Sequence, residues 1–214
     1  MSAAPRIAVI DYGVGNRRSV EKALERVGAR PEITADADAI AAADGLVLPG
    51  VGAFPAGAEW LQARGLDAVV RDRVAAGVPL LGLCLGMQLL FERSRELGGA
   101  DGLGLLEGEV VALQPYGERL PHIGWNAVRW ERPSPLLAGL PAETYLYHVH
   151  SFAAVPADEA DVLGTADYGG RFVAAVARPP VYGVQSHPEK SSAHGLALLA
   201  NFARVCAGVS AAPA

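Results

Sequence analysis

The sequence predicts an α/β protein: an open, mostly parallel sheet flanked by helices, with an antiparallel β extension in its second half. Two observations predict this class. Up to about residue 95, short and continuously apolar runs alternate with helical segments, as in parallel sheets covered on both faces. Beyond residue 108 most of the chain consists of β-rich runs separated by turn-rich pieces. No linker, repeat or low-complexity run interrupts residues 1–214, so we expect a single domain.

The first half alternates strand and helix in a regular order. Gly28 and Gly65 mark a helix end and a helix interruption, because glycine commonly ends helices. We expect strands at 7–11, 31–34, 45–50 and 78–83, and helices at 16–27, 36–43, 55–76 (interrupted near Gly65) and 87–95.

The second half is expected to hold strands and one closing helix. The strands are predicted at 109–113, 126–130, 144–149, 162–166, 172–177 and 181–185. The helix is predicted at 192–205, where Leu196, Leu199 and Phe202 share one face. The strands form either an extension of the same sheet or a β layer beside it.

Composition excludes several classes of function. The 18 basic and 23 acidic residues give a net charge of −5, which argues against binding to nucleic acid. Glycines, Pro79 and Gln88 break the longest apolar stretch, residues 78–90, and a membrane span needs about 20 apolar residues. With no signal-peptide core and two cysteines, we expect a cytoplasmic protein without disulfides.

The clearest local motif is GLCLGMQ, residues 82–88, between an apolar strand and a helix. Glycines on both sides of Cys84 are typical of a nucleophile elbow, a tight turn that presents one side chain. A helix N-terminus favours a thiolate, and the backbone N–H of Leu85 is placed to hold an oxyanion. A buried cysteine that only packs in the core is the other interpretation of this motif.

A base for such a thiol is available in VYGVQSHPEKS, residues 181–191. His187 and Glu189 are two residues apart in an extended segment and share a face. Cysteine, histidine and an orienting carboxylate are the set used in covalent acyl transfer. In LPGVGAF, residues 48–54, Gly52 could supply a second oxyanion donor at the end of a neighbouring strand. The alternatives are an ordinary strand-end turn and a plain loop.

These motifs together carry a family resemblance. GLCLGMQLLF and HPEKS resemble the class I (triad) glutamine amidotransferases, whose fold is flavodoxin-like. DYGVGN (residues 11–16), LPGVGAF and PHIGWN (residues 121–126) narrow it to glutaminase subunits that serve a cyclase of histidine biosynthesis. The resemblance runs from Ile7 to the final helix.

The resemblance implies hydrolysis of L-glutamine through a Cys84 thioester, with no cofactor and no metal. His187 would transfer protons and Glu189 would orient it. The remaining implied contacts are backbone oxyanion donors at Gly52 and Leu85, and substrate contacts from Gln88 and from the backbone of His150, Ser151 and Phe152.

The resemblance also implies a partner. Ammonia would pass to a (β/α)8-barrel cyclase, which forms imidazole glycerol phosphate and an aminoimidazole carboxamide ribotide, in a heterodimer. The positions implied at the contact, or in coupling to it, are Asn16, Trp125, Asn126, Tyr147 and Lys190. From residue type alone, Trp125 could equally be a core residue.

Some residues depart from the family pattern or carry no predicted role. Arg17 and Arg18 follow Asn16, where the family often has Leu. His148 stands where the family usually has an aromatic residue, and Ser186 where it commonly has Phe. These three departures affect only the expected interface detail and coupling to the partner. His148, His150 and His187 do not predict a metal site, because no run of Cys or carboxylate ligands accompanies them. We expect His122 and His194 to be surface or packing residues and Cys206 to be a packing residue, and DYGVGN falls short of a nucleotide-binding fingerprint.

Three other functions stay open on the sequence. One is a glutaminase subunit of another synthase, of the anthranilate or aminodeoxychorismate type. A second is a stand-alone γ-glutamyl or peptide cysteine hydrolase on a similar elbow. The third is a binding or regulatory module without turnover, which an intact Cys84, His187 and Glu189 set disfavours.

Overall fold

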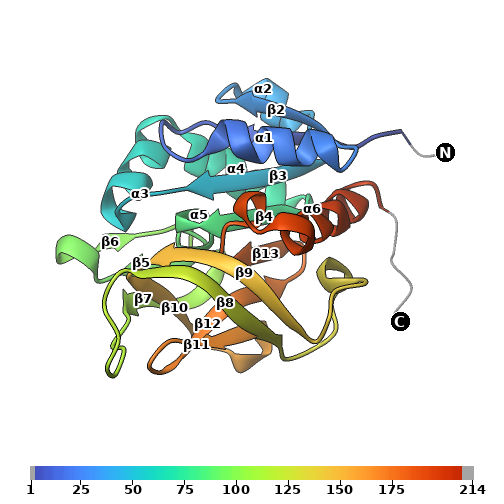
Figure 1. Cartoon of the computed structure of the whole chain (residues 1–214). Helices are drawn as coiled ribbons and strands as arrows, with labels where there is room; N and C mark the ends of the chain where they lie inside the picture. Colours follow the sequence, from blue (N-terminus) through green and yellow to red (C-terminus); the bar gives the residue numbers. More distant parts are fainter. Residues whose placement is uncertain (1–2, 209–214) are drawn as a thin grey trace.

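The computed structural model describes residues 3–208 and has a parallel sheet at its centre (Figure 1). Its five parallel strands lie in the order β2-β1-β3-β4-β13. They are β1 (Arg6–Ile10), β2 (Arg30–Thr34), β3 (Gly45–Gly50), β4 (Leu80–Cys84) and β13 (Val181–Val184). The helices are α1 (Arg17–Arg26), α2 (Ala37–Ala41), α3 (Phe54–Ala63), α4 (Leu66–Ala75), α5 (Leu85–Gln88) and α6 (Ser192–Cys206).

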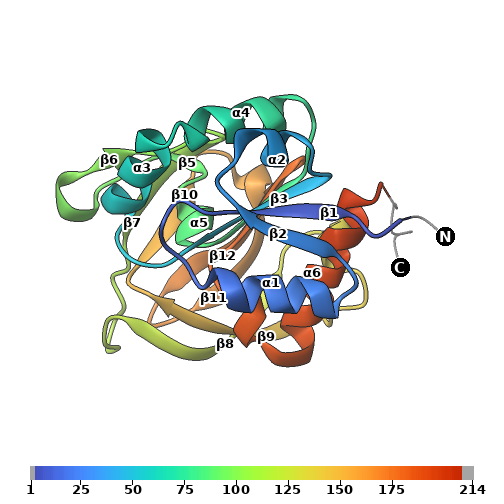
Figure 2. The same ribbon diagram turned by 90° about the horizontal axis from the view of Figure 1, so that it is seen from above.

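Helices cover both faces of this sheet, as the apolar strands predict. Helices α1 and α6 lie on one face, and α2, α3 and α4 lie on the other (Figure 2). Alternate strand residues point to opposite faces, so that Val9 packs with α1 and α6 whereas Ile10 packs with the α2–α4 side. Burial of both faces explains why the inner strands are apolar, whereas the edge strand β2 carries exposed polar residues.

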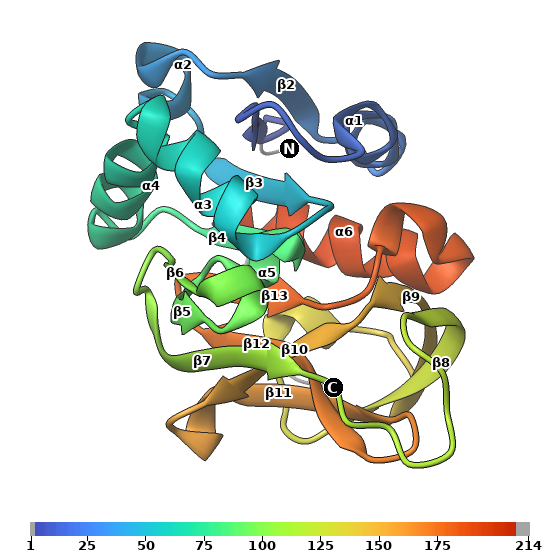
Figure 3. The same cartoon turned by 90° about the vertical axis from the view of Figure 1, so that its left-hand side faces the viewer.

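The second half extends the sheet mainly through antiparallel pairs, which confirms that part of the prediction. β12 (Arg171–Arg178) pairs antiparallel with β13 and is followed across the sheet by β10 (Phe152–Pro156), β7 (Leu106–Ala112), β5 (Phe91–Ser94) and β6 (Ala100–Asp101). A branch through β11 (Val162–Asp167) reaches the long pair β8 (His122–Trp130) and β9 (Glu143–His150). This β8–β9 pair lies beside the main sheet, below α6 (Figure 3).

The helix predicted at 87–95 is wrong. Helix α5 has one turn and stops at Gln88, and Phe91–Ser94 is strand β5. Met87, Leu90 and Phe91 have helical spacing, which favoured the helix. Pairing of Phe91 with Leu106 in β7 overrides that local preference, because it adds a strand to the sheet. Strands β6 and β10 were not predicted at all.

Among residues 3–208 no helix is long and apolar enough to cross a membrane.

Candidate active site

Cys84 occupies a strained turn between β4 and α5. Its φ is +53° and its ψ is −112°, a conformation that is rare for a residue with a side chain. The flanking glycines are needed for close packing. A Cβ on Gly86 would lie 1.7 Å from the Leu48 carbonyl oxygen, and one on Gly82 would lie 2.6 Å from the Gly86 carbonyl oxygen. The elbow therefore fits against β3 only with glycine at both positions.

The close packing around Gly86 predicts that a larger residue there lowers the stability of the fold. Gly86→Ala should lower the free energy of unfolding by at least about 3 kcal/mol, because α5 must move away from β3 to admit the methyl group. Gly57→Ala in α3 is the matched control. Its methyl group would meet the flexible end of Leu85 at 3.1 Å, and alanine favours the helix, so a change within about 1 kcal/mol is expected. Urea unfolding of both variants measures this, and equal losses would contradict the account of the elbow.

His187 and Glu189 follow β13, the strand next to β4. His187 Nδ1 lies 3.0 Å from Glu189 Oε1, and both side chains are almost fully buried. The segment is tied to β9, because the His187 N–H donates to the Tyr147 carbonyl at 2.8 Å. Ser191 completes the tie: its hydroxyl donates to the His187 carbonyl and accepts the Tyr147 N–H. Backbone and side-chain bonds together thus fix the histidine beside β4.

The surroundings of His187 favour its charged form. Burial pulls the pKa of the imidazole down, but hydrogen bonds to Cys84 and Glu189 outweigh burial and raise that pKa to about 9. His187 therefore carries a proton across the neutral range. A protonated imidazole next to sulfur stabilises a thiolate and is ready to give a proton to a leaving group.

Two buried residues near Cys84 had no role in the sequence prediction. Gln185 Nε2 lies 3.7 Å from Cys84 Sγ, and its Oε1 accepts a hydrogen bond from Gln88 Nε2 at 3.1 Å. The Tyr12 hydroxyl donates to the Pro49 carbonyl at 2.7 Å, and burial together with Cys84 raises the pKa of that hydroxyl. A polar Gln185 directly after the apolar β13 run was the available signal for the first of them.

A pocket of about 290 Å³ opens in front of Cys84. Nine of the predicted site residues line it: Gly52, Cys84, Leu85, Gln88, His150, Ser151, Phe152, His187 and Lys190. Glu189 lies behind His187. A larger hollow of about 740 Å³, bordered by β7, β10 and β12, contains none of the catalytic candidates.

The structure separates the remaining predicted residues from this pocket. Trp125 and Tyr147 are register partners on β8 and β9, with ring centroids 6.1 Å apart, and Trp125 is 52% exposed. Asn126 points the other way, since its Nδ2 donates to the Asp167 carbonyl at 2.7 Å. Asn16 is the residue before α1, and its side chain makes no cap hydrogen bond. The structure therefore does not bring Asn126 to the face that Trp125 occupies.

Cys206 and His122, for which the sequence predicted no catalytic role, are both at least partly buried. Cys206, the last residue of α6, packs against the core, and burial raises the pKa of its thiol to about 12, as expected of a packing residue. His122 is buried and packs, which is one of the two roles expected for it, and it joins His148 and His150 in one group. The sequence did not indicate this group, because His122 is far from the other two along the chain.

Comparison with known proteins agrees with the fold. The family described as glutamine amidotransferase class-I matches residues 8–206. Solved structures titled as a glutamine amidotransferase (TM-score 0.73, 22% identity, 95% of this chain and 99% of that one) and PurLQS from Thermotoga maritima (TM-score 0.68, 20% identity, 93% and 96%) share the fold. The chain belongs to the class I glutamine amidotransferases.

Within that class the relatives narrow the family further. The imidazole glycerol phosphate synthase subunits HisH of Moorella thermoacetica and Bacillus cereus are 52% and 50% identical to this chain, each over 92% of it and 93% of the relative. The corresponding subunit of Symbiobacterium thermophilum is 49% identical over 97% of this chain and 98% of its own length. At this identity and coverage the chain is a member of the HisH family.

Proposed function

We propose that this chain is the glutaminase subunit of an imidazole glycerol phosphate synthase, a single amidotransferase domain acting in histidine biosynthesis. It hydrolyses L-glutamine and passes ammonia to a cyclase subunit. The observation that carries the proposal is the arrangement in the pocket, where a thiol on a strained elbow faces a buried His187–Glu189 pair. Its relatives are named as subunits of this synthase, which supports the choice of synthase and implies a partner subunit.

In the first half-reaction the Cys84 thiolate attacks the side-chain carbonyl carbon of glutamine. The backbone N–H groups of Leu85 and Gly52 are assigned to the oxyanion that forms. His187 gives its proton to the leaving nitrogen, so that ammonia departs and a γ-glutamyl thioester remains on Cys84. The charged state of His187 suits this step, because the proton is already present at neutral pH.

In the second half-reaction water attacks the thioester. His187, now neutral, accepts a proton from that water, and the bond from carbon to sulfur breaks. Glutamate leaves and the thiolate–imidazolium pair is restored. Glu189 holds Nδ1 of His187 at 3.0 Å, which leaves the other ring nitrogen to work in the pocket.

The test of this function is glutamine hydrolysis by the chain alone and with the cyclase subunit bound to its phosphoribosyl ligand. Low basal hydrolysis that rises by at least about tenfold with the liganded partner is expected. Rapid partner-independent hydrolysis of varied γ-glutamyl compounds would instead indicate a stand-alone hydrolase. Activation by the partner of another synthase, and not by this cyclase, would assign the chain to that enzyme.

The proposed partner surface is the outer face of the β8–β9 pair, where Ile123, Trp125 and Tyr145 are exposed beside Tyr147. Exposed aromatic side chains on a rigid ribbon are typical of interface anchors. Lys190 is exposed at the rim of the pocket, toward this side of the site. Ammonia released at Cys84 would then emerge next to the partner.

Trp125→Ala should weaken cyclase binding by roughly 30-fold, because it removes the largest exposed ring of this face. Trp60→Ala is the matched control, since Trp60 is 39% exposed but lies on α3. Its Kd should stay within about twofold of the unaltered chain. Calorimetric titration with the cyclase measures both variants, and equal effects would move the interface elsewhere.

A further inference from the structure

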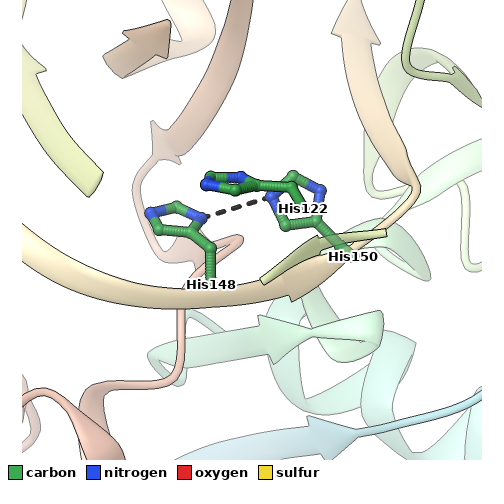
Figure 4. A group of neighbouring side chains, drawn as sticks. All are labelled: His122, His148 and His150. Carbon is green, nitrogen blue, oxygen red and sulfur yellow. Dashed lines mark hydrogen bonds between the residues drawn. The ribbon is translucent and has the colours of Figure 1, made fainter. Parts of the chain in front are cut away.

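Three buried histidines gather between the β8–β9 pair and the strands beneath it (Figure 4). His122 begins β8 and is the register partner of His150 at the end of β9, and His148 lies two residues earlier on β9. Each ring offers one nitrogen such that the three nitrogens lie within 4.8 Å of one another. This His122–His148–His150 cluster has no part in the glutamine chemistry above, which uses only the backbone of His150.

Protein contacts leave the cluster incompletely paired. His150 Nδ1 donates to the Phe152 carbonyl at 2.9 Å, which leaves its Nε2 as an acceptor. His148 Nδ1 lies 3.3 Å from that Nε2 and donates to it. The buried atoms His148 Nε2 and His122 Nδ1 have no hydrogen-bond partner among residues 3–208. Buried ring nitrogens without partners are costly, unless something else fills the site.

The spacing of the rings is that of ligands around one small ion. The three centroid separations are 5.1, 5.2 and 5.3 Å. Imidazoles bound tetrahedrally to zinc have centroids about 5 Å apart and ligating nitrogens about 3.3 Å apart. The 3.3 Å separation between His148 Nδ1 and His150 Nε2 already meets the second value, and to bind through Nδ1 His148 would carry its proton on the unpartnered Nε2 instead. His122 must turn out of its stack on His148, where the ring planes are 15° apart, because its nitrogen is only within 4.8 Å of the other two.

We propose that His122, His148 and His150 form a binding site for one zinc ion, with a water molecule as the fourth ligand. Three neutral imidazoles suit zinc, and an open fourth position is common in His₃ sites. The hydrogen bond from His150 Nδ1 to the Phe152 carbonyl is the kind of outer contact that orients a ligating histidine.

Aromatic neighbours keep the rings ordered. Tyr168 stacks on His122 with centroids 3.9 Å apart, and Phe172 meets all three rings edge-on. Asn126 Nδ2 lies 3.4 Å from His122 Nε2.

Zinc at this position would join β8 to β9. Both strands carry the proposed partner face on their outer side, and the backbone of His150 borders the substrate pocket. A bound ion would therefore stiffen the ribbon between pocket and partner. The site itself does not depend on the proposed function, and its test needs no turnover.

The experiment titrates the chelator-treated chain with Zn²⁺ alone, by calorimetry and by thermal unfolding. One ion per chain is expected, and at a hundredfold excess over Kd the Tm should rise by about 5 to 10 °C. His148→Phe keeps a ring of similar shape without nitrogen and should lose at least tenfold in affinity. His122→Gln tests the other strand, and the Tm of each metal-free variant shows whether it folds. His194→Phe, a partly exposed histidine on α6, is the matched control and should bind as before.

A spectroscopic arm separates this site from Cys84 and His187. Co²⁺ in place of Zn²⁺ should give visible bands of a tetrahedral nitrogen and oxygen site without a thiolate charge-transfer band, and Cys84→Ser should leave them unchanged. No binding by the unaltered chain would mean that only ordered water fills the cluster, and would overturn the proposal. Binding that survives both His148→Phe and His122→Gln, or that is lost with Cys84→Ser, would overturn it too.

Discussion

Cys84→Ala is expected to abolish glutamine-dependent product formation by the complex with the cyclase, by at least about 10⁴-fold in kcat, because no other group can carry the thioester. Product formation from added ammonium salt should persist at its normal rate. Free ammonia bypasses the pocket, and the substitution removes only one sulfur from the elbow. The two rates are measured with the same assembled complex.

Cys206→Ala is the control for this substitution. Cys206 is the other cysteine. It is partly buried, packs against the core, and has a thiol whose pKa burial raises to about 12. Its glutamine-dependent rate should match that of the unaltered chain. Loss of both the glutamine- and the ammonia-dependent reactions in Cys84→Ala would contradict a separate glutaminase that delivers ammonia.

The parallel half of the fold was predictable because its inner strands are buried on both faces, whereas β2 lies at the edge and is partly exposed. Strands such as Gly45–Gly50 are apolar throughout, and Gly65, with φ of +66°, marks the break between α3 and α4. Local sequence and tertiary structure agree in these segments. They disagree at 87–95, where helical spacing of apolar residues is overruled by pairing of β5 with β7, which no local pattern reports.

The pocket was predictable where chemistry is local and unpredictable where it depends on long-range contact. Cys84 between two glycines and His187 two residues before Glu189 are short motifs. Gln185 approaches Cys84 only because β13 lies next to β4, and His122 meets His148 only through the register of β8 with β9. Asn126 was predicted to lie on the partner side because of its motif. Side chains alternate along β8, so the Asn126 side chain points to the opposite face from Trp125.

Glu189→Gln is expected to reduce kcat for glutamine hydrolysis by about 10³- to 10⁴-fold, and His187→Ala by at least about tenfold more. The order follows from the roles. His187 moves the protons of both half-reactions, whereas Glu189 orients Nδ1 at 3.0 Å and helps to keep the ring charged. Glutamine keeps the size of the side chain, so the loss reports the missing charge. The reverse order would contradict these roles.

The pH dependence distinguishes this account from simple misfolding. His187 has a pKa raised from 6.5 to about 9, so its protonation stabilises the fold fully below about pH 6.5 and ceases to do so as pH rises through 9. In the unaltered chain kcat/KM should fall as pH rises through 9, because His187 then loses the proton that it gives to the leaving nitrogen. Glu189→Gln removes one of the two partners that raise this pKa. Both the fall of kcat/KM and the loss of stability should therefore occur at lower pH. Glu118→Gln, on an exposed loop, is the control and should leave both profiles in place. A Glu189→Gln enzyme that is slow but keeps the original alkaline limb would show that Glu189 contributes only geometry, because the charge of His187 would then come from Cys84 alone.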